Sequence, residues 1–236
     1  MLSNPYPWLV STLFMLPGIL IAIPAHELGH ALAARWLGDR SAGNRLTDHL
    51  REPRRFFTMY GLAMLIFWRV GWGERIPVRD NQFSTRSKVL YELAGPAANL
   101  ILAVLFGLLA RPLLMYLDPV QLIQPPAGLL ESVIYAAYFV NLSVMAFNLL
   151  PVPGLDGWRI VEALFRRQNP RFFYDVSARQ PQIVNYLIIG LFLAQFVAGN
   201  LLNVVMLPFY APFATLILGQ CSGYLGLVPC LPSGRF

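Results

Sequence analysis

A run of about 30 mostly apolar residues, 8–37, constrains the fold of this chain more than any other stretch of its sequence. A helix needs about 20 such residues to cross the hydrocarbon core of a membrane. Pro17 and Pro24 are expected to bend or break the helix and so to account for its excess length, because a proline removes a backbone hydrogen bond. Five more apolar runs follow, the last two separated by Pro208, at residues 56–72, 89–117, 128–150, 183–207 and 209–228. With 56% hydrophobic and 13% charged residues, the chain is expected to be an all-α polytopic membrane protein.

Two histidines and a glutamate lie inside the first apolar run, in the sequence His26-Glu27-Leu28-Gly29-His30. Residues four apart in a helix lie on one face, one turn apart, so both imidazoles can reach one metal ion. Zinc accepts neutral imidazole nitrogens, and a catalytic zinc site has a third protein ligand and one open position for water. Glu27, about 100° around the helix, can then act as the general base. Ionisable groups inside a membrane are costly and usually mark a functional site, so a catalytic metal centre is favoured over a histidine pair that only packs against other helices.

The basic residues predict how the chain is oriented. Eleven of the 18 arginines and lysines lie in residues 35–88 and five in residues 159–179. Positive residues concentrate on the cytoplasmic side of membrane proteins, so both clusters are expected there. The apolar run at residues 56–72 then has two cytoplasmic flanks and is expected to be a re-entrant or hairpin segment, which leaves about five spanning helices. An ordinary short spanning helix is the alternative for this run. Topology accounts for the net charge of +6, so no nucleic-acid partner is expected.

Asp156 is the expected third ligand, because this topology brings it to the same side of the membrane as the histidines. Two prolines and two glycines in residues 151–157 prevent the preceding helix from continuing, so the chain can aim the carboxylate at one point. Glu92 and Glu131 are the competing carboxylates. Glu131 is expected near the opposite face of the membrane, and Glu92 is expected to support the site or the structure rather than bind the metal.

Other polar residues are assigned supporting roles. Asn148 lies eight residues before Asp156 and is expected to donate a hydrogen bond to the carbonyl oxygen under attack. For Asn99, such a role and a hydrogen bond between helices stay open as alternatives. His49 lies in a polar, basic stretch, residues 35–55, that is expected to be a loop on the solvent side of the membrane. His49 itself is expected to be a solvated surface residue. The two cysteines could form a disulfide in an oxidising compartment, but two unpaired thiols are favoured, at Cys221 and Cys230.

Three motifs, in this order, resemble those of the site-2 protease family of intramembrane zinc metalloproteases. They are His-Glu-x-x-His at residues 26–30, Gly-Pro-x-x-Asn at residues 95–99 and Asn-x-x-Pro-x-x-x-Leu-Asp-Gly at residues 148–157. Residues 36–39, 45–47 and 71–78 are also similar to bacterial members, whose corresponding segment is a membrane-associated hairpin or re-entrant loop. The chain differs after Thr47, where Asp-His-Leu-Arg replaces the family's frequent Leu-Asn-Pro. It is also expected to lack the peptide-binding or nucleotide-sensing domain that many members carry.

The resemblance, which covers residues 8–158, implies an endopeptidase that cleaves a peptide bond within or near a transmembrane segment of a substrate protein. The resemblance also implies one Zn²⁺ per chain, bound by His26, His30 and Asp156, with Glu27 as the base. Apart from substrate, the lipid bilayer is the expected partner, and the oligomeric state is not predicted. The expected location is the cell membrane, with the site towards the cytoplasm.

Residues 1–157 are expected to form a protease core, residues 158–182 a cytoplasmic loop that begins with a short amphipathic helix, and residues 183–236 a pair of transmembrane helices. A catalytically silent membrane protein of the same fold, which binds helices or metal without cutting, is the alternative function. A third possibility is a metalloprotease that acts on a lipidated terminus at the membrane surface. Such enzymes usually have a glutamate as third ligand, and no downstream glutamate is as well placed as Asp156.

Overall fold

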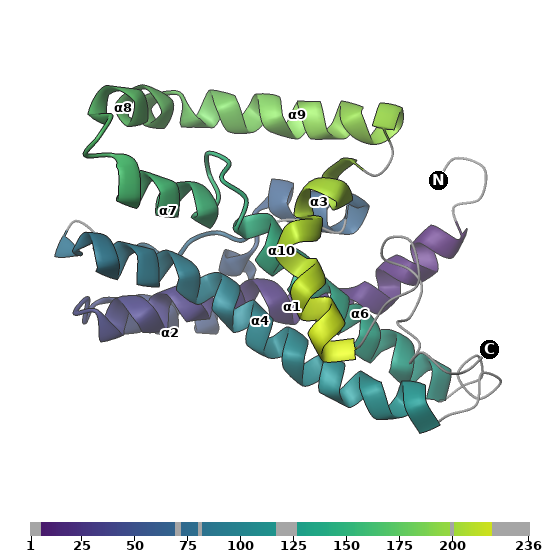
Figure 1. Cartoon of the computed structure of the whole chain (residues 1–236). Helices are drawn as coiled ribbons and strands as arrows, with labels where there is room; N and C mark the ends of the chain where they lie inside the picture. Colours follow the sequence, from purple (N-terminus) through teal and green to yellow (C-terminus); the bar gives the residue numbers. More distant parts are fainter. Residues whose placement is uncertain (1–5, 69–71, 80–81, 117–126, 199–200, 219–236) are drawn as a thin grey trace.

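The computed structural model describes residues 6–68, 72–79, 82–116, 127–198 and 201–218. Within these ranges every regular element is helical, and one isolated antiparallel bridge joins Phe57 to Gly73. The expected all-α architecture is therefore confirmed (Figure 1). The elements in chain order are α1 (Tyr6–Trp36), α2 (Ala42–Arg51), the 3-10 helix η1 (Pro53–Phe56), α3 (Met59–Trp68), α4 (Thr85–Tyr116), α6 (Ala127–Asn148), α7 (Asp156–Phe165), α8 (Pro170–Ala178), α9 (Gln180–Ala198) and α10 (Leu201–Leu218).

Three long helices, α1, α4 and α6, form the centre of the molecule and pack against one another in all three pairings (Figure 1). In the described residues these are also the helices that are long and apolar enough to cross a membrane, over Thr12–Trp36, Thr85–Leu113 and Gly128–Asn148. Pro17 and Pro24 were expected to bend or break the first helix, and they do not break it, because α1 runs without interruption through both. Neighbouring helices commonly support such prolines inside a membrane, where backbone groups freed by a proline find other partners.

The stretch between α1 and α3 was expected to be a loop on the solvent side, and the expectation of a loop is wrong. It contains the helix α2, whose residues Ala42, Leu46 and His49 are buried against α1 and η1. These residues follow the spacing i, i+4 and i+7, which places them on one face of a helix. His49 is accordingly not a solvated surface residue: its Nδ1 lies 2.8 Å from the carbonyl oxygen of Arg45, and its ring packs edge-on against Phe56.

The apolar run at residues 56–72 forms a short helix with its two ends side by side. The helix α3 has 10 residues, so it is about 15 Å long, roughly half the thickness of the hydrocarbon core. The chain on either side of it is joined by the Phe57–Gly73 bridge and by a hydrogen bond of 2.9 Å from the N–H of Glu74 to the carbonyl oxygen of Phe56. After this bridge, residues 74–79 continue without regular secondary structure to the active site.

The chain leaves α6 at Asn148, passes through a non-helical turn and enters α7 at Asp156, as the prolines and glycines there predicted. The expected amphipathic helix after this turn is α7, which buries Trp158 and exposes Leu164 and Phe165. The boundary expected at Pro208 is wrong, since α9 ends at Ala198 and α10 runs through Pro208. Cys221 and Cys230 lie outside the described residues.

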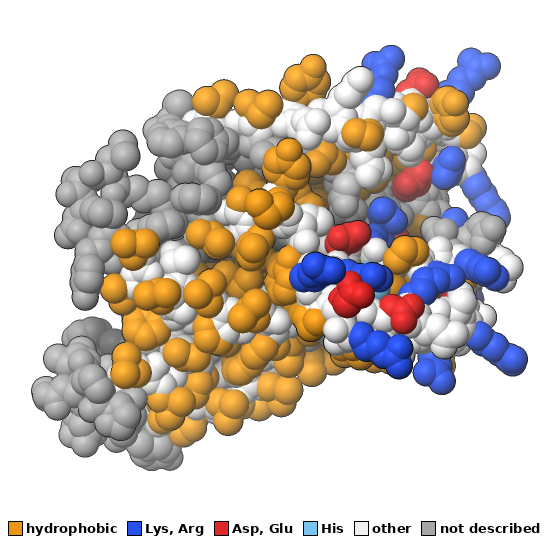
Figure 2. Space-filling model, turned by 180° about the vertical axis from the view of Figure 1, so that it is seen from behind, with side chains coloured by type: hydrophobic (Ala, Val, Ile, Leu, Met, Phe, Trp, Pro, Cys, Tyr) orange, Lys and Arg blue, Asp and Glu red, His pale blue; other side chains and the backbone are white. Residues whose placement is uncertain are grey.

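Charged and apolar side chains separate on the surface. Figure 2 shows lysine, arginine, aspartate and glutamate gathered at one end, the end that carries α2, α7 and α8, while hydrophobic side chains cover most of the remaining described surface of that face. On α4, the outward positions Ile101, Leu105 and Leu108 are more than half exposed. A soluble domain rarely exposes such a continuous apolar area, whereas a lipid-facing helix requires it.

Candidate active site

Three potential metal ligands converge where α1 meets the start of α7. His26 Nε2 lies 3.0 Å from Asp156 Oδ2, His30 Nε2 lies 3.2 Å from the same oxygen, and the two Nε2 atoms are 3.2 Å apart. The three residues are the group of potential metal ligands found in the described part of the chain, and each is at most 4% exposed. The structure thus brings together His30 on α1 and Asp156 at the start of α7, which are 126 positions apart in the sequence.

The spacing of these donors fits one small metal ion. Bonds of about 2.0–2.2 Å to a tetrahedral zinc ion place neighbouring donor atoms about 3.3 Å apart, close to the distances observed. A triangle of three donors is one face of a tetrahedron and leaves the fourth position for water or substrate. Two imidazole nitrogens and a carboxylate oxygen are also a donor set that zinc accepts.

A chain of hydrogen bonds fixes the orientation of His26. Its Nδ1 lies 2.7 Å from Asn99 Oδ1, and the amide group of Asn99 donates to the carbonyl oxygen of Ala22 and to Asn141 Oδ1. Asn141 in turn donates to the carbonyl oxygen of Ala137. Because Asn99 Oδ1 can only accept, the proton of His26 is on Nδ1 and the lone pair of Nε2 points to the metal position. The chain of bonds links α6, α4 and α1.

His30 is oriented in the same way by α4. Its Nδ1 lies 2.8 Å from the carbonyl oxygen of Tyr91, an obligate acceptor, and its ring packs against the ring of Tyr91 with centroids 5.1 Å apart. Both imidazoles therefore carry the Nδ1 proton and present Nε2 to one point. This arrangement is typical of metal-binding histidines and would bring two lone pairs together if no cation lay between them.

Two glycines allow α1 and α4 to approach closely at the site. A Cβ on Gly95 would lie 2.3 Å from His30 Nε2 and 2.7 Å from His26 Nε2, so a larger residue would occupy the space of the imidazoles. A Cβ on Gly29 would lie 2.4 Å from the carbonyl oxygen of Ala94 on the facing helix. The glycine of the Gly-Pro-x-x-Asn motif thus forms one wall of the site, and the asparagine of the motif orients the potential ligand His26.

The turn that presents Asp156 depends on two further glycines. Gly154 has a φ of +103°, a conformation that favours glycine, and a Cβ on Gly157 would lie 2.2 Å from the carbonyl oxygen of Leu149. The turn can therefore double back tightly on the end of α6.

Arg75 connects Asp156 to a second buried carboxylate. Its Nη2 lies 2.8 Å from Glu92 Oε2 and also contacts Asp156 Oδ1, while its guanidinium lies 5.9 Å from the centre of the Tyr91 ring. Burial opposes the charge of Arg75, but Asp156 and Glu92 outweigh it and raise the pKa of the guanidinium. One arginine therefore compensates two buried carboxylates, of which Glu92 is one of the two competing ligands considered above.

Glu27, the expected base, is buried beneath the non-helical segment, residues 73–79, that carries Arg75. Its Oε2 accepts a hydrogen bond of 3.3 Å from the backbone N–H of Ile76. Its Oε1 lies 3.3 Å from the position that a Cβ on Gly73 would take, so this segment passes directly over the carboxylate. The segment both covers the site and holds the glutamate in place.

The far end of the covering segment is fastened to the residues that follow α1. Asp39 Oδ2 accepts a hydrogen bond of 2.8 Å from the N–H of Arg79, and Arg45 on α2 donates to the carbonyl oxygen of Pro77. Burial opposes ionisation of Asp39, but hydrogen bonds from Ser41 and Arg79, together with Arg45, outweigh it and lower the pKa of the carboxyl.

Other residues expected at the site take different places. Asn148 is buried, and its side-chain amide donates 2.9 Å to the carbonyl oxygen of Val144 on its own helix, so its role towards substrate stays a prediction. Of the two roles left open for Asn99, the structure shows interhelical hydrogen bonds and, in addition, contact with His26. Glu131 is not part of the metal-ligand group.

Sequence reasoning missed Arg75 and Asn141 as parts of this site. Asn141 carried a usable signal, because an amide inside a membrane helix generally has a hydrogen-bonding partner on another helix. Arg75 carried no such signal, since its charge is also explained by the cytoplasmic excess of basic residues.

Comparison with known proteins places the chain that forms this site in a family. The family model described as peptidase family M50 matches residues 14–125 and 118–195. Rip2 of Mycobacterium tuberculosis is 34% identical over 81% of this chain and 71% of its own length, and YwhC of Bacillus subtilis is 34% identical over 67% of this chain and 69% of its own length. Rip3 of M. tuberculosis is 30% identical over 83% of this chain and 42% of its own length, and all three are named "Putative zinc metalloprotease". No solved structure matches the chain. The chain is a membrane protein and belongs to peptidase family M50, the site-2 protease family.

Proposed function

We propose that this protein is a zinc-dependent intramembrane endopeptidase that cleaves a peptide bond within or next to a transmembrane segment of a substrate protein. The observation that carries the proposal is the convergence of His26, His30 and Asp156 at the charged end of three membrane-length helices. Zinc, one ion per chain, is the proposed metal because the donor set fits it and because the relatives are named as zinc metalloproteases.

The protein's own residues supply the rest of the chemistry. Zinc bound by the three ligands would act as a Lewis acid and lower the pKa of a water molecule. Glu27 would act as the general base that takes a proton as water adds to the peptide carbonyl, and would return that proton to the amine nitrogen as the C–N bond breaks. The N–H of Ile76 holds the Glu27 carboxylate in position for both steps. The hydrogen bonds that His26 donates to Asn99 Oδ1 and that His30 donates to the carbonyl oxygen of Tyr91 keep the two histidines oriented.

An apolar cavity beside the site suits a transmembrane substrate. It has a volume of about 170 Å³ and lies between Trp72, the turn that precedes Asp156 and helix α9. Its walls are mostly hydrophobic and include Phe147, Leu155 and Val184. A side chain of an apolar substrate segment could be held here. The two chain segments that border the cavity also carry Gly73, which lies next to Glu27, and Asp156, so the cavity is adjacent to the catalytic residues.

The proposed topology has α1, α4, α6, α9 and α10 crossing the membrane and α3 entering and leaving on one side. The short length of α3 and the bridge between Phe57 and Gly73 support the re-entrant path. The gathering of arginine and lysine at one end supports a cytoplasmic position for the active site, because basic residues concentrate on that side. The proposed location is therefore the cell membrane, with the lipid bilayer and a transmembrane substrate as partners.

Substitution of Glu27 separates the protease from a catalytically silent relative of the same fold. In Glu27→Gln, the zinc content of the purified protein should equal that of the wild type, whereas cleavage of transmembrane proteins should be lost and uncut substrates should accumulate in cells. Glu74→Gln, on an exposed residue near the site, is the matched control and should leave both unchanged. Wild-type cleavage in Glu27→Gln would contradict the role of the base, and an identical set of membrane proteins in all three strains would favour the silent alternative.

Zinc measurement tests the ligand set. Asp156→Ala should reduce the zinc content well below one ion per chain, because two histidines alone bind zinc far more weakly than three ligands. Full zinc occupancy in Asp156→Ala would refute the assignment of the third ligand.

A further inference from the structure

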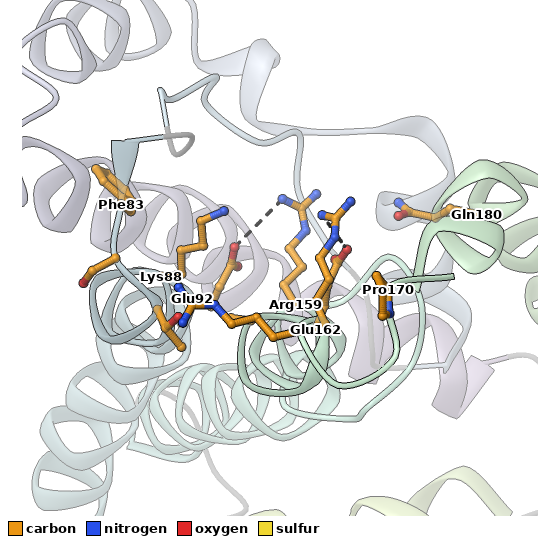
Figure 3. Close-up of a pocket in the computed structure, with 12 residues that line it drawn as sticks. Phe83, Lys88, Glu92, Arg159, Glu162, Pro170 and Gln180 are labelled. Carbon is orange, nitrogen blue, oxygen red and sulfur yellow. Dashed lines mark hydrogen bonds and ion pairs between the residues drawn. The ribbon is translucent and has the colours of Figure 1, made fainter. Parts of the chain in front are cut away.

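A second, larger cavity lies beside the active site at the charged end of the molecule. It has a volume of about 520 Å³ and opens between the first turns of α4, the helix α7 and the start of α8 and α9. Figure 3 shows Lys88 and Glu92 of α4 on one side of this cavity, facing Arg159 and Glu162 of α7. Its walls also include Arg166 and Arg167, so four basic and two acidic side chains meet there.

The two acidic side chains are already compensated. Glu162 pairs with Arg166 at 3.2 Å, and Glu92 pairs at 2.8 Å with Arg75, which approaches from the active site. Arg159 is left with one long contact of 3.9 Å to Glu92. Among the residues that the structure describes, no carboxylate lies within 4.0 Å of Lys88 or Arg167. The cavity therefore carries an excess of positive charge available to a ligand.

The cavity is connected to the catalytic centre through Glu92. This residue lines the cavity and contacts Arg75, which contacts the metal ligand Asp156. A polypeptide held at the metal would need to leave the site at this charged end, where the membrane helices stop. The position favours a segment of the substrate as the occupant. A small-molecule site is usually lined mainly by apolar and aromatic side chains, unlike this cavity.

We propose that this cavity binds an acidic stretch of the substrate, located where the substrate leaves the membrane on the side of the active site. The inference rests on the proposed function. Cytoplasmic flanks of transmembrane segments are generally rich in lysine and arginine. The basic cavity repels such flanks and attracts the minority that carry aspartate or glutamate, so the charge of the flank selects the substrate by both attraction and repulsion.

Cleavage of three reporters tests the selection. The reporters share one transmembrane segment and differ in a six-residue inner flank that is acidic, neutral or basic. The wild-type protein, reconstituted in vesicles with zinc, should cleave the acidic reporter with a kcat/KM about tenfold or more above that of the basic one, with the neutral reporter between them. The double variant Lys88→Glu/Arg167→Glu should invert the order of the acidic and basic reporters. Arg86→Glu, in the same turn of α4 but outside the cavity, is the control and should keep the wild-type order.

Binding to the inactive protein tests the cavity independently of cleavage. A fluorescent acidic ten-residue peptide should bind to full-length Glu27→Gln at low salt, bind about tenfold more weakly when Lys88 and Arg167 are also reversed, and be unaffected by Arg86→Glu. If the wild type cleaves no reporter, the proposed function fails while this binding result still decides whether the cavity takes acidic peptide. Equal cleavage of all three reporters, or peptide binding that survives the double reversal, would overturn the inference.

Discussion

The Nδ1 atom of His26 lies 2.7 Å from Oδ1 of Asn99, so an asparagine on α4 determines which nitrogen of a histidine on α1 faces the metal position. Asn99 is completely buried, and its amide is held by Ala22 and Asn141. The orientation of His26 therefore depends on a side chain that does not itself reach the metal.

Asn99→Ala should lower the affinity of the site for zinc by about 10–100-fold, because His26 would lose the acceptor that fixes its tautomer and its ring orientation. Titration of the purified variant with a competing chelator measures this loss. Asn141→Ala, one hydrogen bond further from the metal position, should also lower the affinity for zinc, but by a smaller factor. An unchanged zinc affinity in Asn99→Ala would show that the hydrogen bond to His26 does not contribute to metal binding.

Gly95→Ala should abolish stoichiometric zinc binding, because the new Cβ would lie 2.3 Å from His30 Nε2, far inside van der Waals contact. The facing helix α1 could move away only by losing its close contact at Gly29. Zinc content and thermal unfolding of the purified variant measure the two consequences. Gly190→Ala on α9 is the matched control, because its added Cβ would have nothing within 4 Å and helix propensity alone should stabilise the variant slightly. If Gly95→Ala holds a full complement of zinc, the close approach of α4 to the histidines is not required.

The part of the site that could be predicted from sequence follows from local helix geometry. His26, Glu27 and His30 lie within about one helical turn, so their relative positions need no knowledge of the fold. Asp156 required a topological argument, because it lies 126 positions from His30, and the proline-rich turn before it was the local signal. The charge pattern and the helix-breaking residues predicted that Asp156 lies near the histidines, and its Oδ2 lies 3.0 and 3.2 Å from their Nε2 atoms.

The parts that could not be predicted depend on which surfaces meet. The excess of basic residues on the cytoplasmic side of membrane proteins assigns Arg75 to that side but identifies no partner for it. Its contacts with Asp156 and Glu92 therefore could not be predicted from the sequence. The buried face of α2 was hidden for a different reason. The α2 sequence contains four charged or amide side chains, so by composition it looks like a polar loop. The helix is indicated only by the spacing of its buried residues, which include Leu46 and His49.

Arg75→Met should destabilise the protein by about 2–3 kcal/mol, because Glu92, which is 4% exposed, would be left without its closest cation. This is less than the loss expected for a fully buried pair, since the side chain of Arg75 is 22% exposed. The double variant Arg75→Met/Glu92→Gln removes the uncompensated charge and should recover a large part of the loss. Denaturant unfolding of the two single variants and the double variant gives the interaction energy. Purely additive effects would show that Arg75 and Glu92 do not stabilise each other.

Asp39 should make the attachment of the covering segment sensitive to acid. Its pKa is lowered in the folded protein, so the carboxylate stabilises the fold fully above the ordinary aspartate pKa of about 4, and this contribution is lost as the pH falls through the lower, folded-state value. Asp39→Asn cannot ionise and should be less stable than the wild type at pH 7 by about 1–2 kcal/mol, the size of a hydrogen bond to a charged group. Thermal unfolding of both proteins at a series of pH values from about 7 to 3 should show this difference shrinking below about pH 4. A difference that stays constant over the whole series would mean that the charge of Asp39 does not contribute, and that its contact with the N–H of Arg79 acts as a neutral hydrogen bond.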